Sequence, residues 1–290
     1  MGTSELPDEF RADFIQAQLR RPREMILSLL YKLNHALLWQ REINVWERRM
    51  RAASLDRLVY LGLHRLGWMG EDEAILLRRL VRPGMQVVDV GANIGLYSLL
   101  LAQLVGRSGS VLAFEAEPNL FAILRENCAI NGATNIVAFQ CALGRANALA
   151  SFQRSAFHSG DNRLGDALVG HEAVEVRVER FDDIQPGSKP DFVKIDVQGH
   201  ELAALTGMER ALSARPNVRV LFEFSPAALR KAGTPPELLL GFFRERGFEL
   251  YETQGAHLKR VHDSQQLISR LSGKRYTDLL ASRDAVATNV

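Results

Sequence analysis

Residues 85–95 constrain the fold of this chain more than any other stretch. Residues 85–90 form an apolar run of the length and composition typical of a strand buried on both faces of a sheet. Gly91 and Gly95 follow it, and glycines after a buried strand let the backbone turn sharply and approach a ligand closely. The stretch therefore predicts a nucleotide-type binding loop between the first strand and a helix of an α/β domain.

The spacing and charge of this loop favour S-adenosylmethionine over a dinucleotide. Asn93 stands where dinucleotide-binding loops carry a glycine, and Gly91 and Gly95 lack the G-x-G-x-x-G spacing that receives a pyrophosphate. Asp89, just before the loop, would repel a pyrophosphate but suits a cofactor with an ammonium group and a sulfonium. An NAD-dependent oxidoreductase is the alternative that this charge disfavours.

A second strand, near 110–115, ends in another acid, Glu115. A carboxylate at the carboxyl end of the neighbouring strand can accept hydrogen bonds from both ribose hydroxyls of a bound nucleoside. Glu117, just before Pro118, is instead suited to the N-terminus of the next helix. We therefore expect Glu115, and not Glu117, to bind the ribose.

The rest of the chain alternates between strand-like and helix-like segments, which predicts an α/β fold with a mostly parallel, doubly wound sheet. Residues 247–251 and 257–261 predict an antiparallel closing hairpin. Residues 148–153 and 173–178 predict two further strands around a long polar loop, and such loops at the carboxyl edge of a sheet usually shape a binding site. The predicted strands are 85–90, 110–115, 135–141, 191–196 and 217–224, and the predicted helices 95–105, 118–131, 201–213 and 235–246.

Helical spacing before the first strand predicts an N-terminal helical extension at 1–80. We expect a Rossmann-like domain at 81–265 and a C-terminal helical tail at 266–290 to follow it. The basic cluster at 20–23 lies beside an apolar stripe. Such a helix can pack against the adjoining domain, contact its copy in a homodimer, or lie on an anionic membrane surface.

Composition excludes several classes of protein. A net charge of +2 is too mild for a nucleic-acid binder, for which a dense basic stripe is expected. No stretch is apolar for the roughly 18 residues that a membrane span needs, and the start lacks the pattern of a signal peptide, so we expect a cytoplasmic protein. Cys128 and Cys141 form neither a disulfide framework nor a metal pattern, and we expect both to be small buried side chains.

Polar residues crowd a second time at residues 191–201. Asp196 ends an apolar run. A carboxylate next to a buried strand is costly unless a charged or hydrogen-bonding group pairs with it, so we expect it to have a specific partner or a functional role. Asp196, His200 and Glu201 are each able to take a proton from, or orient, an acceptor hydroxyl. His200 also suits a solvated turn, and Glu201 suits a helix N-terminus. His158, in the long polar loop, is a further candidate for a catalytic role.

Taken in order, these blocks resemble the FkbM-type methyltransferases, which are S-adenosylmethionine-dependent enzymes with the class I Rossmann-like fold. The resemblance covers residues 70–252. It depends on residues 88–95, 113–118, 142–144, 194–201 and 221–223, together with Asn127, Asn131, Gly132 and Asn135. The chain departs from the family at Gln198, where members typically carry an acid.

The resemblance implies S-adenosylmethionine as methyl donor, S-adenosylhomocysteine as product, and O-methylation of a hydroxyl on a sugar, glycan or natural product. Cofactor contacts are predicted at Asp89, Gly91, Ala92, Asn93, Gly95, Tyr97, Glu115, Ala116, Ala142, Leu143 and Asp196. No metal ligand set is predicted. A magnesium ion stays open as an alternative, because carboxylates are available at Asp182, Asp183, Asp196, Glu201 and Glu223.

Methyl transfer from sulfonium to oxygen is an in-line displacement, so a site that aligns the two centres and excludes water gains most. A hydroxyl acceptor also needs its proton held or removed. We expect Asp196 to do this, with His200 or His158 next and Glu223 in support. Nitrogen and carbon acceptors use the same cofactor loop and remain alternatives. So does a non-catalytic scaffold that binds S-adenosylmethionine, which the departure at Gln198 favours.

Overall fold

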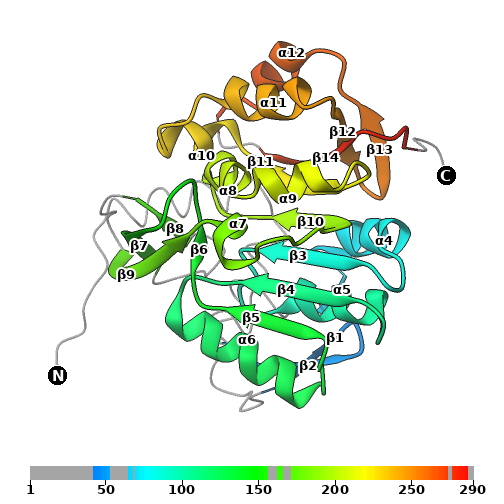
Figure 1. Ribbon diagram of the computed structural model, residues 1–290, viewed down its shortest axis with the longest axis vertical. Helices are drawn as coiled ribbons and strands as arrows, with labels where there is room; N and C mark the ends of the chain where they lie inside the picture. Colours follow the sequence, from blue (N-terminus) through cyan, green and yellow to red (C-terminus); the bar gives the residue numbers. More distant parts are fainter. Residues whose placement is uncertain are drawn as a thin grey trace.

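The computed structural model describes residues 42–52, 65–67, 69–155, 162–165, 171–273 and 276–286. These residues form an eight-stranded sheet with helices on both faces and a four-stranded sheet beside its carboxyl edge (Figure 1). The predicted α/β class, with a mostly parallel, doubly wound sheet and antiparallel closing strands, is confirmed. No helix in the described part of the chain is both long enough and apolar enough to cross a bilayer.

The large sheet has the strand order β13-β12-β14-β11-β10-β3-β4-β5. The strand of this sheet that comes first in the chain, β3, lies between β4 and β10. The order in which strands are added to the sheet therefore reverses direction at β3. Ligands of open α/β sheets bind at such a point. The parallel strands are β3 (Gln86–Val90), β4 (Ser110–Phe114), β5 (Ile136–Phe139), β10 (Phe192–Ile195) and β11 (Arg219–Phe224). The antiparallel ones are β12 (Glu249–Gln254), β13 (His257–Arg260) and β14 (Thr277–Ser282).

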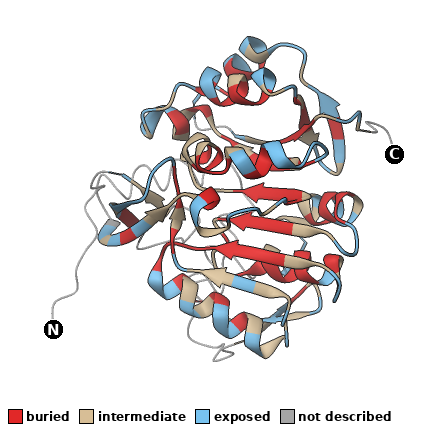
Figure 2. Ribbon diagram, viewed as in Figure 1, coloured by how far each residue is buried: buried red, intermediate tan, exposed pale blue. Residues whose placement is uncertain are grey.

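Two apolar cores lie on opposite faces of this sheet, because successive side chains of a strand point to opposite sides. Val87 packs with one core and Val88 with the other, and both are fully buried. Figure 2 shows the central strands β3, β4 and β10 almost wholly buried. The first face carries α4 (Glu71–Leu80), α5 (Leu96–Val105) and α6 (Pro118–Ile130), and the second α7 (Phe181–Ile184), α8 (Glu201–Gly207), α9 (Glu209–Ala214), α10 (Pro226–Lys231), α11 (Pro236–Glu245) and α12 (Ser264–Arg270).

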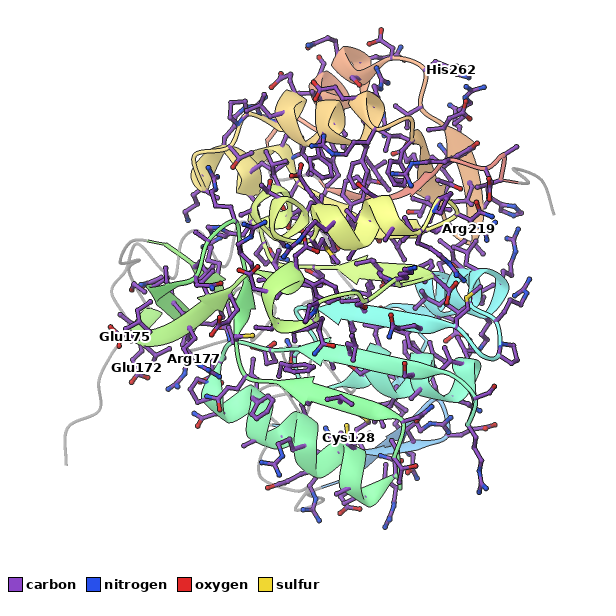
Figure 3. The ribbon with its side chains drawn as sticks, in the orientation of Figure 1. Cys128, Glu172, Glu175, Arg177, Arg219 and His262 are labelled. Atoms are coloured by element: carbon purple, nitrogen blue, oxygen red, sulfur yellow. The ribbon has the colours of Figure 1, made fainter. Side chains whose placement is uncertain are left out.

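The small sheet has the order β6-β9-β7-β8. Its two long strands correspond to the strands predicted at 148–153 and 173–178, and the structure pairs them antiparallel. The short strand β8, which pairs with β7 at the edge of the sheet, was not predicted. Exposed Glu175 and Arg177 lie on the side of β9 opposite buried Val176, so that side faces solvent (Figure 3), whereas Glu172 pairs with Arg154 of β7. The strands are β6 (Ala142–Leu143), β7 (Ala148–Ser155), β8 (Arg163–Leu164) and β9 (His171–Glu179).

The predicted helical tail at 266–290 is wrong for much of its length. α12 is helical, but residues 277–282 form β14, which pairs antiparallel with both β11 and β12 inside the large sheet. Leu279, Leu280 and Ala281 are all fully buried. A short apolar run buried on both faces has no periodicity that separates a strand from a helix. The domain therefore extends to Ser282 instead of ending at 265.

The helical extension predicted at 1–80 is wrong for residues 43–50, and most of its length lies outside the described residues. β1 (Ile43–Val45) and β2 (Arg48–Met50) form a hairpin, and α4 is the helix that leads into β3. The hairpin is docked on α6 by two side-chain amides: Asn127 Oδ1 accepts from the Arg51 backbone N–H at 2.7 Å, and Asn131 Oδ1 accepts from that of Arg49 at 3.1 Å. These two asparagines of the family resemblance therefore have a structural role.

Candidate active site

A cleft of about 990 Å³ opens at the carboxyl ends of β3, β4, β10 and β11. The small sheet lies beside this edge of the large sheet (Figure 1). Arg219, at the amino end of β11, marks the opposite edge of the large sheet (Figure 3). Of the predicted site residues, Gly95 and Glu201 do not line the cleft, and His158 lies outside the described residues. Those that line it are Asp89, Gly91, Ala92, Asn93, Tyr97, Glu115, Ala116, Ala142, Leu143, Asp196 and His200.

The loop after β3 packs backbone to backbone against the turn after β10. Gly91 has a φ of 83°, and a Cβ atom there would overlap the carbonyl oxygen of Asp196. The Asp196 N–H donates to the carbonyl of Val90 at 2.9 Å. Gly91 is therefore required for two reasons, its left-handed backbone and this close approach, and it places Asp196 directly beside the loop.

Asn93 also has a left-handed backbone, with a φ of 52°. Its side-chain Oδ1 accepts from the Ile94 N–H at 2.7 Å, a local bond that makes asparagine one of the few residues suited to this conformation. Gly95 serves packing: a Cβ atom there would lie 2.5 Å from Cδ1 of Leu124. Gly95 therefore lets α5 approach α6 and does not touch the cleft.

Glu115 is held by the backbone of two loops. Its Oε2 accepts from the Asn93 N–H and its Oε1 from the Glu117 N–H, both at 2.8 Å. Burial raises the pKa of Glu115 to about 7, although these two backbone bonds lower it. A carboxylate has about four acceptor positions, so these two bonds do not use all of them, and Glu115 lines the cleft. Glu117 caps α6 by accepting from the Leu120 N–H at 2.7 Å, which matches its predicted position.

Asp89 and Lys194 are charged residues inside neighbouring buried strands, paired in register, with exposed fractions of 1% and 4%. The Ser98 hydroxyl donates to Asp89 Oδ2 at 2.6 Å. Burial raises the pKa of Asp89, while Lys194 and this hydrogen bond oppose the rise. Asp89 is thus a buried carboxyl group at the floor of the cleft.

Lys194 is a site residue that sequence reasoning missed. Its Nζ lies 3.5 Å from Glu73 Oε1, 3.6 Å from Asp196 Oδ2 and 4.4 Å from the centre of the Tyr97 ring. Burial lowers the pKa of Lys194, but the carboxylates of Glu73, Asp196 and Asp89 raise it by more, so it stays above its ordinary value. A lysine within an apolar strand was the available signal, because such a charge requires buried partners.

The side chain of Gln198 bridges two carboxyl groups, Asp196 just after β10 and Glu223 near the end of β11. Its Nε2 donates to Asp196 Oδ1 at 3.1 Å and to Glu223 Oε1 and Oε2 at 3.2 and 3.3 Å. Burial, with Asp196 next, raises the pKa of Glu223 to about 9. Asp278 on β14 lies opposite Glu223 in the strand register, and burial followed by Glu73 raises its pKa to about 8. The end of the cleft around Asp196 therefore holds two further buried carboxyl groups whose pKa is raised.

Two of the predicted catalytic residues make structural bonds. Glu201 Oε1 accepts from the Gly199 N–H at 2.9 Å, and burial raises the pKa of this carboxyl to about 7. His200 Nε2 lies 3.0 Å from the carbonyl oxygen of Leu164 on β8, so this nitrogen carries the donated hydrogen. Burial lowers the pKa of the His200 ring. Glu201 supports the turn, and His200 ties the turn to the small sheet while still lining the cleft.

Residues 89–250, a little over half of the chain, match the family model described as the Methyltransferase FkbM domain. The chain belongs to the FkbM methyltransferase family. Methyltransferase sdnD of Sordaria araneosa is 28% identical over 160 residues, which cover 42% of this chain and 60% of the relative. Hexuronic acid methyltransferase AglP of Haloferax volcanii is 31% identical over 130 residues, covering 43% of this chain and 51% of the relative.

The chain thus spans about half to three fifths of the length of these curated relatives. Among solved structures, the O-methyltransferase TomG from Streptomyces achromogenes, in complex with SAM, is 15% identical and covers 73% of this chain and 79% of its own, with a TM-score of 0.43. The predicted family resemblance is confirmed by the FkbM match. Glu73 and Asp278, which line the cleft, are among its residues that lie outside the matched range.

In this FkbM family member four of the five carboxylates considered for a magnesium ion are divided between two places, and the fifth, Glu201, supports the turn after β10. Asp182 and Asp183 contact Arg210, and Asp182 also accepts from the Ala211 N–H at 3.0 Å, which joins α7 to α9. Asp196 and Glu223 lie in the cleft, bridged by an amide. Within the residues that the structure describes, no three His, Cys, Asp or Glu side chains are grouped to hold a metal ion.

Proposed function

We propose that this chain transfers a methyl group from S-adenosylmethionine to a hydroxyl of a sugar, glycan or natural-product acceptor and releases S-adenosylhomocysteine. One observation carries the proposal: a single cleft at the reversal point of the sheet has Glu115, with free acceptor positions, on one side and Asp196 on the other. Membership of a methyltransferase family supports the reaction class. AglP is named a hexuronic acid methyltransferase, which supports a sugar acceptor.

The residues on the donor side fit S-adenosylmethionine. Gly91 lets the backbone approach closely, Glu115 offers acceptor positions for a ribose diol, and buried Asp89 complements a cationic group. Ala116, Ala142 and Leu143 line the cleft beyond Glu115 and supply apolar surface for an adenine. When bound, the cofactor supplies a methyl group activated by a positively charged sulfur.

On the acceptor side, we assign to Asp196 the task of holding and removing the proton of the acceptor hydroxyl. Lys194 and Gln198 contact its two carboxylate oxygens separately, which fixes its orientation. General-base assistance of this kind contributes about 10²–10⁴-fold, and alignment of the reacting centres contributes about 7–11 kcal/mol to the lowering of the barrier. The Glu223 carboxyl, whose pKa is raised by burial and by Asp196, lines the same end of the cleft and supports Asp196 through Gln198.

The test combines cofactor binding with turnover. The purified chain is titrated with S-adenosylhomocysteine in a calorimeter, and methyl transfer from radiolabelled S-adenosylmethionine is measured on sugars, uronic acids, phenols, amines and carbon acids. Binding together with transfer to a hydroxyl is the expected result. Transfer to an amine or a carbon would correct the acceptor atom, and binding without transfer to any of them would favour a non-catalytic scaffold. No binding would end the proposal.

A further inference from the structure

Gln198 lies between two carboxyl groups that approach each other from different strands. The two hydrogens of one amide group serve three oxygens, Oδ1 of Asp196 and both oxygens of Glu223, at 3.1 to 3.3 Å. The backbone of Gln198 has a φ of 50°, a left-handed conformation that glutamine seldom adopts. The surrounding contacts must therefore hold Gln198 in place, and its side chain is directed at the two acids.

Carboxyl groups this close repel each other when both are ionised, so they need a shared proton, a cation or hydrogen-bond donors. Asp196 has Lys194 on its second oxygen, with Nζ 3.6 Å from Oδ2. Glu223 has no Lys, Arg or His partner within the described part of the chain, and its side chain accepts hydrogen bonds there from Gln198 alone. The amide is thus what holds Glu223 to Asp196.

We infer that Gln198 is a positioning residue whose amide occupies the place of a cation between Asp196 and Glu223. It holds the base and its neighbouring carboxyl at a fixed separation without adding charge to the acceptor side of the cleft. This inference rests on the proposed function in one respect: it takes Asp196 to be the base. The contacts of the amide with the two carboxyl groups do not depend on that assignment.

A glutamate at position 198 would reverse this arrangement, because three carboxylates would then meet at one point. Carboxylate oxygens are the ligands that hard divalent cations prefer. The charged groups that act on Asp196 or Glu223 include Lys194 on β10, Glu201 on α8 and Asp278 on β14, with Glu73 on α4 paired to Lys194. Arg163 and Lys231 line the same cleft. Gln198→Glu should therefore create a divalent-cation site at a point where the described residues of the natural chain group no set of metal ligands.

The first experiment measures Mn²⁺ binding to the full chain by electron paramagnetic resonance. Gln198→Glu is expected to bind one Mn²⁺ at least tenfold more tightly than the natural chain. The double variant Gln198→Glu with Glu223→Gln, which removes one of the three carboxylates, should return to the affinity of the natural chain. Equal Mn²⁺ affinity of the natural chain and Gln198→Glu would overturn the inference.

A second measurement keeps the test decisive if Gln198→Glu fails to fold. Gln198→Met keeps the size of the side chain and removes both N–H donors. In ¹³C-carboxyl NMR, with Glu223→Gln used to assign the signal, the pH midpoint of Glu223 should move upward in Gln198→Met, because the bond from Gln198 favours the ionised form. An unchanged midpoint would show that the amide does not hold Glu223.

Calorimetry with S-adenosylhomocysteine separates the two proposals. If the natural chain does not bind it, the proposed function fails, while the Mn²⁺ and NMR comparisons still decide the role of Gln198. Gln198→Met is expected to bind S-adenosylhomocysteine within about threefold of the natural chain, since the hydrogen bonds of the Gln198 amide go to Asp196 and Glu223, whereas Glu115 is held by the N–H groups of Asn93 and Glu117. A loss of tenfold or more would assign Gln198 to the cofactor side instead.

Discussion

The two sides of the cleft hold their acids by different means. On the donor side, Glu115 is fixed by the backbone N–H groups of Asn93, 22 residues earlier in the loop after β3, and of Glu117, two residues later. On the acceptor side, Asp196 and Glu223 are held by the side chains of Lys194 and Gln198, and the charged residues come from α4, β10, β11 and β14. Backbone geometry thus shapes the donor side, whereas a network of charges shapes the acceptor side.

The largest effect is expected from Lys194→Met, which tests whether the acceptor side depends on its buried cation. The substitution leaves Glu73, Asp89 and Asp196 without their shared partner, and breaking a buried ion pair costs about 3–5 kcal/mol. Urea denaturation should show that loss. Exposed Lys259 on β13 provides the control, because Lys259→Met should change the free energy of unfolding by less than about 0.5 kcal/mol. A loss below about 1 kcal/mol for Lys194→Met would contradict the comparison.

Gly91→Ala tests the backbone geometry of the donor side. Its cost combines a left-handed conformation with the overlap against the Asp196 carbonyl, and should reach about 3 kcal/mol. Gly233 has a φ of 77° with open space around it, so Gly233→Ala isolates the conformational cost of about 1–2 kcal/mol. Chemical denaturation gives both values. Equal losses would mean that the close approach to Asp196 contributes nothing.

Glu115→Ala separates binding from stability on the donor side. Loss of a hydrogen bond to a charged group should weaken S-adenosylhomocysteine binding by about 1.5–3 kcal/mol, and the two unpaired N–H groups should lower the free energy of unfolding by about 1–3 kcal/mol. Asp182 is the matched control, since it is a buried carboxylate that accepts two backbone N–H groups away from the cleft. Asp182→Ala should lose similar stability and keep its affinity; an unchanged affinity in Glu115→Ala would refute the ribose assignment.

Glu223→Gln tests the charge network through its pH dependence, with a smaller effect. The pKa of Glu223 is about 9 in the folded chain and about 4.3 when unfolded, so the folded state binds more protons and stability falls as pH rises between these values. Glu223→Gln should be more stable than the natural chain by about 1–2 kcal/mol at pH 8 and nearly equal at pH 4. Thermal unfolding across pH measures this. Glu245→Gln, at a highly exposed position, should show no such difference, and a pH-independent effect of Glu223→Gln would contradict the raised pKa.

The sequence by itself determined the donor side and the parallel part of the sheet. The loop at residues 89–95, Glu115 at the end of the next strand and Asp196 at the end of β10 are each visible as an acid or glycine that follows an apolar run. This succeeds because a strand, its turn and the next helix are local, and because parallel strands bring their carboxyl ends to one edge. The hydrophobic periodicity of the chain carries that information directly.

Only the tertiary structure decided how the acceptor side is assembled. Glu73 meets Lys194 because α4 packs beside β10, and Asp278 meets Glu223 because β14 inserts next to β11, although neither pairing has a local signal. The same reason explains the predicted tail that proved to be a strand, and the hairpin at residues 43–50 that docks on α6. Burial and charge pairing between distant segments depend on which strands become neighbours, and periodicity along one segment does not contain that choice.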